Sequence, residues 1–272
     1  MNNGSSNSTA LSATEQNRSA PTGVPAPDAP GAAPDGRVPS PGPVPAVPGS
    51  AAEDALADPR YARFVTDLLG VIAYGELSGF ERLSSDARFS PSLADRANLG
   101  QLAVQEFERF ERVSRFVAEL GVTIEDAMVP FQSSIDAFHE RTRPGDWYES
   151  LMKAYVIDGF SGDFYRSLAD SLDPRTRRLI STIDSGEEAA QLQRRLKEAL
   201  ADDPRLASRL ALWGRRLVGE ALTQAQRVGM GREYLAGFLF ADEADHTQHT
   251  TALFSQLTRN HSRRMSALGL TA

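Results

Sequence analysis

Apolar residues recur at intervals of three and four from about residue 58 onward, and this period predicts a succession of helices. The predicted helices begin near Asp58-Pro59, after Ser90-Pro91, near Ala127, after the turn Arg143-Pro144-Gly145-Asp146, near Asp203-Pro204 and near Arg232, with two short charged helices within residues 174–202. All six prolines of this part of the chain are expected where a helix begins or breaks, because proline is favoured in the first turn of a helix and disruptive in its interior. No run of strand-like alternation interrupts the pattern. It therefore predicts an all-α bundle of four long helices with additional short helices.

The first 52 residues differ in composition from the rest of the chain. Ten of the sixteen prolines lie between Pro21 and Pro48, among Ala, Gly, Ser and Val and without aromatic residues. So little apolar surface cannot offset an ordering cost of about 1–2 kcal/mol per residue. We therefore divide the chain into a disordered leader, residues 1–52, and a helical domain, residues 53–272. A flexible tether is the simplest role for the leader, and its partner is unknown.

Composition narrows the classes of protein further. The absence of cysteine excludes disulfides, thiolate metal sites and a cysteine nucleophile. The N-terminal residues lack the basic start and apolar core of a signal peptide, and the longest uncharged apolar stretches, Leu68–Gly75 and Tyr234–Ala241, are too short to span a bilayer. We therefore expect a cytoplasmic protein without membrane contact. Arginine clusters such as Arg175–Arg178 offer phosphate contacts, but the net charge is -7 and acids alternate with them, so solvated helix faces are the simpler interpretation.

Each of the four long helices has one acidic residue at a position that its apolar period assigns to the core. These residues are Glu76, Glu106, Asp158 and Glu220. Any one of them alone is more simply interpreted as a boundary residue whose carboxylate reaches water, but the coincidence in all four helices is harder to explain in this way. Because an isolated buried carboxylate costs several kcal/mol, four converging carboxylates would need a metal ion, protons or a cation.

The segments that contain these acids resemble the metal-bearing helices of the ferritin-like family of tRNA isopentenyladenosine hydroxylases. The matching segments are Tyr74-Gly75-Glu76, Gln105-Glu106-Phe107-Glu108-Arg109-Phe110, Lys153-Ala154-Tyr155-Val156-Ile157-Asp158-Gly159 and Leu217-Val218-Gly219-Glu220-Ala221. The resemblance extends from about Asp58 to Leu268 and is strongest to a divergent branch. It implies a ferritin-like four-helix bundle with a di-iron centre that activates dioxygen to hydroxylate 2-methylthio-isopentenyladenosine. The partner would then be tRNA, and a homo-oligomer is one assembly that the resemblance allows.

In this resemblance the four acids correspond to carboxylate ligands of the metals, but the histidine ligands have no counterpart. The positions three residues after Glu106 and Glu220 hold Arg109 and Thr223. A guanidinium group cannot ligate a metal, and a threonine hydroxyl is a poor ligand for iron. Two interpretations stay open. One is an active hydroxylase whose iron or manganese is held by oxygen ligands alone; the other is a non-catalytic, metal-free binding or structural protein in which Arg109 compensates the buried carboxylates.

The histidines supply no stronger metal site. The string Glu243-Ala244-Asp245-His246-Thr247-Gln248-His249 has the spacing of a metal site, but it lies in a wholly polar stretch, so we interpret it as an exposed loop or helix start. His139 and His261 are expected to be ordinary surface or boundary residues.

Overall fold

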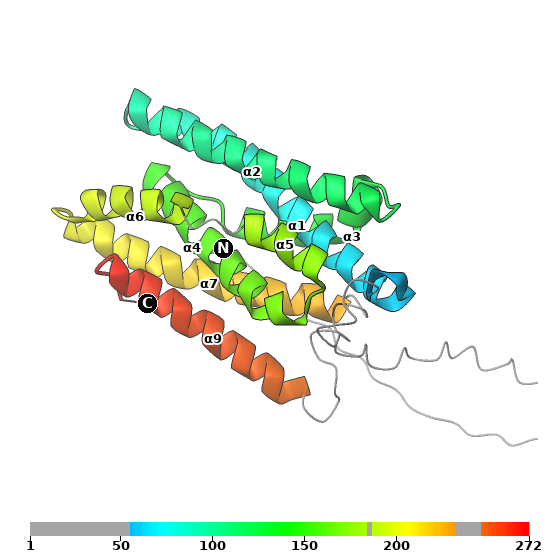
Figure 1. Ribbon diagram of the computed structural model, residues 1–272. Coiled ribbons are helices and arrows are strands. Elements are labelled where there is room, and N and C mark those ends of the chain that lie inside the picture. The colour runs from blue at the N-terminus through cyan, green and yellow to red at the C-terminus, as the bar shows by residue number, and fades with distance from the viewer. Residues whose placement is uncertain (1–54, 184–186, 232–234, 236–245, 272) are drawn as a thin grey trace, which may run out of the picture. The chain divides into compact units, whose positions relative to one another are not determined.

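Helices make up nearly all of the described part of the computed structural model, which comprises residues 55–183, 187–231, 235 and 246–271 (Figure 1). These residues belong to one unit, Pro41–Ala272. No strand occurs among them, so the predicted all-α class is confirmed. None of the described helices is long and apolar enough to cross a membrane. The predicted leader, residues 1–52, lies outside the described residues.

Most of the predicted helix starts are confirmed to within a few residues. The helices are α1 (Pro59–Asp86), α2 (Leu93–Glu119), α3 (Ile124–Arg141), α4 (Trp147–Leu168), α5 (Pro174–Ile183), α6 (Glu187–Leu200), α7 (Pro204–Gly231) and α9 (His246–Ala267), with short 3-10 turns at Ala55–Ala57, Ala87–Phe89 and Ala169–Ser171. Capping chemistry explains the agreement, because it is local: Asp58 accepts a hydrogen bond of 2.7 Å from the backbone N–H of Arg60, beside Pro59 in the first turn. The predicted start of the last helix, near Arg232, lies outside the described residues.

Pro130 lies inside α3, so the expectation that every proline marks the start or break of a helix is wrong at this position. α3 begins at Ile124 because the hydroxyl of Thr123 caps it, accepting a hydrogen bond of 3.1 Å from the backbone N–H of Asp126. Pro130 removes one intrahelical hydrogen bond. The buried side chains of Ala127 and Phe131, on either side of it, pack into the core that α1 and α3 share, which keeps the helix continuous.

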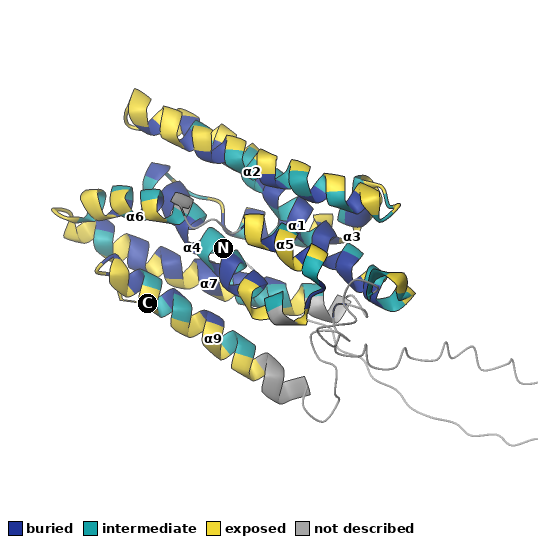
Figure 2. Ribbon diagram, viewed as in Figure 1, coloured by how far each residue is buried: buried dark blue, intermediate teal, exposed yellow. Residues whose placement is uncertain are grey.

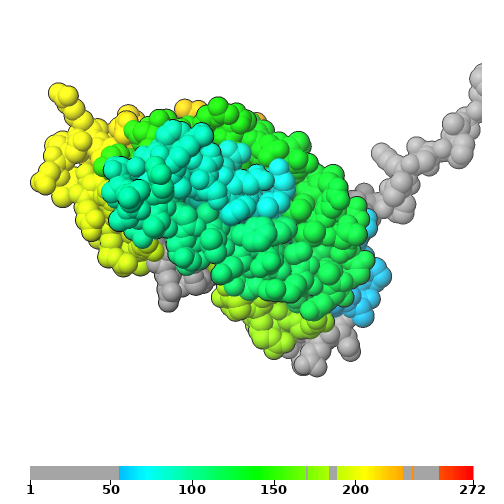
Figure 3. Space-filling view, turned by 90° about the horizontal axis from the view of Figure 1, so that it is seen from above, coloured from blue at the N-terminus to red at the C-terminus, as the bar shows by residue number. Residues whose placement is uncertain are grey.

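The long helices pack as two pairs that α3 connects. α1 packs along α2 and along α3, and α3 also contacts α7, while α4 packs against α7, α6 and α9. α2 and α7 each have a buried stripe and an exposed stripe, whereas α4 is buried or half-buried along nearly all of its length (Figure 2). In the space-filling view, residues coloured cyan to green, which belong mainly to α1, α2 and α3, cover much of one face, and α6, in yellow, lies at one end (Figure 3).

Two large apolar clusters form the core. One includes Phe64 and Phe131 and joins α1, α2 and α3; the other includes Met152, Leu217 and Met265 and joins α4, α7 and α9. Residues of both clusters line a cavity inside the bundle. The same helices therefore supply the core and the walls of the cavity.

α1 and α3 approach each other closely at Gly70. A Cβ atom at this position would lie 2.1 Å from the carbonyl oxygen of Ala127, which is backbone and cannot rotate away. We predict that Gly70→Ala lowers the free energy of unfolding by about 1–3 kcal/mol, the usual cost of overpacking, as measured by urea denaturation.

Gly75→Ala is the matched control in the same helix, because a Cβ atom there meets nothing within 4 Å. This variant should be neutral or stabilised by about 0.5–1 kcal/mol, since alanine favours a helix over glycine. Equal losses of stability in the two variants would show that the close approach does not require Gly70.

Candidate functional site

Arg109 of α2 lies at the centre of an acidic cluster. Its Nε donates a hydrogen bond of 2.9 Å to Oε2 of Glu76, and its Nη2 lies 2.8 Å from Oε1 of Glu106 and 4.0 Å from Oδ1 of Asp158. The Arg109 side chain is 4% exposed, so it is almost wholly withdrawn from water. Three of the four predicted carboxylates, from α1, α2 and α4, are thus brought together around a cation.

Packing of the helices sets this arrangement. Glu106 and Arg109 share one face of α2, since they lie three residues apart. Gly79 of α1 makes room for Glu106, because a Cβ atom there would lie 3.2 Å from the Glu106 carboxyl group. Asp158 is the most exposed of the three acids, at 33% of its side chain, so water shares in solvating its charge.

The protonation of the cluster follows from burial and from the paired charges. Burial alone would lower the pKa of Arg109, but the carboxylates of Glu106 and Glu76 and the hydrogen bond to Glu76 raise it above its usual value, so the guanidinium stays charged. The pKa of Glu106 is raised well above 4.5 by burial, then by the charge of Glu76 and the hydrogen bond between the two carboxyl groups. Glu106 therefore keeps its proton to higher pH than an exposed glutamate does.

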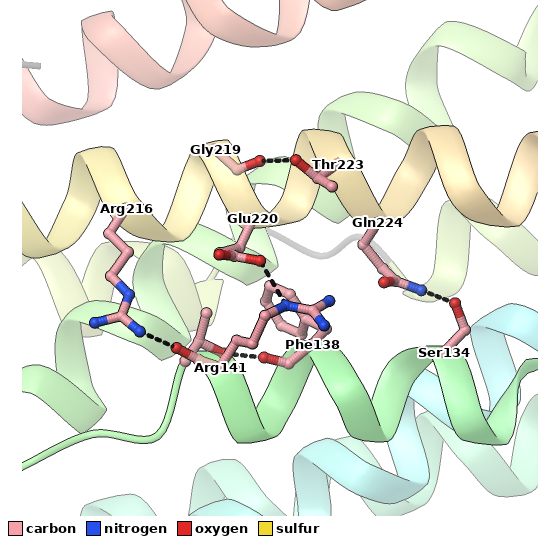
Figure 4. A network of polar contacts seen from close by, with 9 residues as sticks. Ser134, Phe138, Arg141, Arg216, Gly219, Glu220, Thr223 and Gln224 are labelled. Carbon is pink, nitrogen blue, oxygen red and sulfur yellow. Dashed lines mark hydrogen bonds and ion pairs between the residues drawn. The ribbon is translucent and has the colours of Figure 1, made fainter. Parts of the chain in front are cut away.

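Glu220 and Thr223 of α7 make their contacts with α3 and with α7 itself (Figure 4). The carboxylate of Glu220 pairs with Nε of Arg141 on α3 at 2.8 Å, and the hydroxyl of Thr223 donates to the carbonyl oxygen of Gly219 at 2.8 Å. The face of α7 that lines the cavity includes Ala221 and Gln224 instead. Gln224 lies four residues after Glu220 on the same face of α7 and donates a hydrogen bond to the hydroxyl of Ser134 on α3, so this face of α7 meets α3 and not Arg109.

The donors that the structure brings together do not fit a metal centre. Among the described residues, no group of three or more Asp, Glu or His side chains is arranged to hold a metal ion. The nearest approach to such a group surrounds Arg109, whose positive charge is paired with the same oxygens that a metal would need. Thr223 occupies the other position at which the family resemblance expects a histidine ligand. Its hydroxyl donates a hydrogen bond to the carbonyl oxygen of Gly219 in the same helix.

A cavity of about 780 Å³ adjoins the acidic cluster, with Glu76, Glu106, Arg109 and Asp158 in its wall. The larger part of the wall is apolar and comes from α1, α3, α4, α7 and α9. Its apolar residues include Ile135, Phe138, Phe160, Phe164, Leu253 and Phe254. A cavity of this size and character is typical of a binding site for a small molecule.

The expectation that His139 and His261 are surface or boundary residues is wrong, because both are buried, at 7% and 1% exposure. α1 and α7 pack against α3, and α4 and α7 pack against α9. Positions that look like boundary positions in the sequence are therefore buried. His139 lines the cavity. Of the predicted histidine string, His246 begins α9, and Glu243 and the side chains of His246 and His249 lie outside the described residues.

Lys153 is a cavity residue that the sequence interpretation did not single out. Its side chain is buried at 7% exposure, and its Nζ donates a hydrogen bond of 2.9 Å to the carbonyl oxygen of Thr142. Its position beside Leu151 and Met152, on the apolar face of α4, was the available signal, but a lysine there is usually assumed to extend its amine to water.

We predict that Arg109→Ala lowers the free energy of unfolding by about 3–5 kcal/mol, because it leaves buried carboxylates without their cation. Urea denaturation would measure this loss. Arg115→Ala, at an exposed position of the same helix, is the control and should change stability by no more than about 0.5 kcal/mol. Combining Arg109→Met with Glu76→Gln should recover much of the loss, and an Arg109→Ala effect as small as that of Arg115→Ala would contradict the assignment of Arg109 as the central cation.

The raised pKa of Glu106 predicts that stability declines as pH rises above 4.5, because the folded protein then binds a proton that the unfolded chain has released. Glu106→Gln, which mimics the protonated acid, should flatten this decline and stabilise the protein at neutral pH. Unfolding measured from about pH 5 to about pH 8 tests this, with the exposed Glu108→Gln as control. An unchanged pH profile in Glu106→Gln would count against the raised pKa of Glu106.

Comparison with known proteins places the fold. Among solved structures, "Protein 19 with aldehyde deformylating oxidase activity" from Synechococcus superimposes with a TM-score of 0.61 at 19% sequence identity, over 80% of this chain and 94% of that chain. At this identity the likeness shows the fold alone. No curated protein matches the chain. The family model described as "Ferritin-like domain, actinomycetes" matches residues 59–242, which is more than half of the chain, and the protein therefore belongs to this family of ferritin-like domains.

Proposed function

We propose that this ferritin-like protein binds an apolar small molecule in its central cavity without using a metal ion. The observation that supports this proposal is the position of Arg109, whose guanidinium lies 2.9 Å from Glu76 and 2.8 Å from Glu106 at the edge of the cavity. The proposal corresponds to the metal-free interpretation of the sequence.

Charge balance is the first argument. A metal ion among these carboxylates would sit beside the buried guanidinium and meet a repulsion of roughly 4 kcal/mol per unit of metal charge at 4 Å, with an effective dielectric constant of about 20. Since Arg109 already satisfies the carboxylates of Glu76 and Glu106, a metal would also have to displace it from both hydrogen-bonded contacts. Arg109 and the proton that Glu106 retains compensate much of the negative charge, and water solvates the partly exposed Asp158.

The cavity is the second argument. A volume of about 780 Å³ falls within the range of sites for small molecules, and its wall is mainly apolar with a few convergent polar groups. The polar groups are concentrated in an otherwise apolar wall, which is the arrangement by which small-molecule sites orient a ligand.

The di-iron hydroxylase activity that the sequence resemblance implies stays a prediction, as do tRNA as the partner and iron or manganese as the cofactor. Glu76, Glu106 and Asp158 would have to release Arg109 for such a centre to form, and Glu220 would have to leave Arg141. Measuring the metal content together with ligand binding separates this activity from the proposed one.

We predict that the protein, produced in medium supplemented with iron and manganese, binds the neutral fluorescent probe N-phenyl-1-naphthylamine equally well before and after treatment with a chelator. Metal content, measured by mass spectrometry of the same samples, should be well below one ion per chain, and the melting temperature should not change on chelation. A stoichiometric metal whose removal abolishes probe binding would refute the metal-free proposal.

A cavity variant shows where the probe binds. Ala225→Trp places a large side chain in the wall and should weaken probe binding at least tenfold, about 1.4 kcal/mol. Ala118→Trp, at an exposed position of α2, should leave binding unchanged. Equal binding by both variants would place the probe outside the cavity.

A further inference from the structure

The central cavity follows two helices for most of their length. On α1, its wall residues recur every three or four positions over about five turns: Leu68, Val71, Gly75, Gly79, Arg82 and Asp86. α4 has a matching stripe of wall residues: Ser150, Ala154, Ile157, Ser161 and Tyr165. Residues at this spacing share one face of a helix, so α1 and α4 each line the cavity with one continuous face.

The two stripes run in opposite directions past each other. Asp86, near the end of α1, accepts a hydrogen bond of 2.5 Å from the hydroxyl of Ser150, near the start of α4. About three turns away, Arg109 joins Glu76 of α1 to Asp158 of α4. The ends of the two stripes therefore coincide, and the cavity is elongated along α1 and α4.

The dimensions of the cavity suit a chain-shaped molecule. At a rise of about 1.5 Å per residue, the stripe on α1 is about 27 Å long and the stripe on α4 about 22 Å. A volume of about 780 Å³ spread over this length leaves a mean cross-section of roughly 30 Å². A single extended hydrocarbon chain fits this space, whereas a fused-ring molecule of equal volume is shorter and wider.

The two ends of the cavity differ in their exposure to water. The wall near Asp86 includes Phe89, which is 55% exposed, and Arg143, whose side chain is 72% exposed, so this end opens to solvent. At the other end, Leu68, Ile183 and Leu235 are at most 3% exposed. The cavity thus has a mouth beside the turn that precedes α4 and, within the described residues, a closed apolar end.

The charged groups of the wall are also distributed unevenly. Those at and near the mouth have both signs: Glu81, Asp86, Arg82, Arg88, Arg143 and Lys153. Because the two signs are mixed, the mouth favours neither an anion nor a cation, and water solvates a polar group there. The side chains of Leu68, Ile183 and Leu235 at the closed end are aliphatic, so they solvate only an apolar group.

We propose that the cavity binds an unbranched, single-chain amphiphile, whose apolar chain extends from the mouth toward Leu68 and whose polar head stays at the mouth. This inference rests on the proposed function and names the class of ligand for the same cavity. The chain packs against Phe138 of α3 and Phe254 of α9. On the α2 side it passes the acidic cluster, where Arg109 pairs with both glutamates, so these need no polar group from the ligand.

Gly75 offers a way to shorten the cavity. It lies in the wall, about 16 Å from Asp86 along α1, and a Cβ atom there meets nothing within 4 Å. A leucine at this position therefore has room to extend across the path of the chain. Gly219 of α7 is the matched control, because its Cβ atom would also meet nothing within 4 Å, but it is exposed and lies outside the cavity wall.

The test uses the full chain and a series of alkyl dimethylamine oxides, which have no net charge at neutral pH, with tails of about eight to about fourteen carbons. Displacement of N-phenyl-1-naphthylamine, below the concentration at which micelles form, measures their affinities. In the wild-type protein each added methylene group should tighten binding about threefold to fourfold throughout the series, because the chain continues to meet apolar space.

In Gly75→Leu this gain should stop at about ten carbons, since an extended chain advances about 1.2 Å per bond. The longest ligand should then bind at least tenfold more weakly than to the wild-type protein, and the shortest equally well. Gly219→Leu should follow the wild-type series. Circular dichroism establishes that each variant is folded.

Two results would overturn the chain-shaped ligand. One is a wild-type affinity that stops rising below about ten carbons, and this readout decides the matter even if Gly75→Leu does not fold. The other is a folded Gly75→Leu variant whose affinities follow the wild-type series or are weakened equally for every chain length. Failure of the probe and of every amine oxide to bind would instead refute the proposed function.

Discussion

The ion pairs of Arg109 determine how the centre of this bundle is built. A buried guanidinium and buried carboxylates are each costly alone, and together they form a group that three helices must position jointly. α1 supplies Glu76, α2 supplies Glu106 and Arg109, and α4 supplies Asp158. Any relative sliding of these helices would separate charges in a place that water scarcely reaches, so the cluster fixes their register.

The sequence predicted the helices and the three acids because both depend on local features. A capping aspartate followed by proline specifies where α1 and α7 begin, and the apolar period specifies which face of a helix is buried. Glu76, Glu106 and Asp158 violate that period, as Glu220 does, and it was the coincidence in several helices, more than any single acid, that indicated a polar cluster. The substitution of Arg109 at a ligand position then indicated a cation in that cluster.

Other features could not be predicted because they depend on tertiary packing. Glu220 and Gln224 lie four residues apart on one face of α7, and only the packing of α7 on α3 shows that Glu220 meets Arg141 while Gln224 meets Ser134 and lines the cavity. His139 similarly looks like a boundary residue in the sequence pattern of α3. It is buried because α1 and α7 both pack against this helix. The place of Lys153 in the cavity wall could not be predicted from the sequence, because the residues that line this cavity come from separate segments of the chain.

The guanidinium at the centre of the acidic cluster has a consequence for how this protein matures. A metal centre has to be loaded after or during folding, from a cellular supply that varies and competes with other ions. Arg109 is part of the chain and keeps its charge at every physiological pH, so the centre is complete as soon as the helices pack. If the proposed metal-free function holds, folding of the bundle requires no metal ion, because α2 itself supplies the cation of its centre.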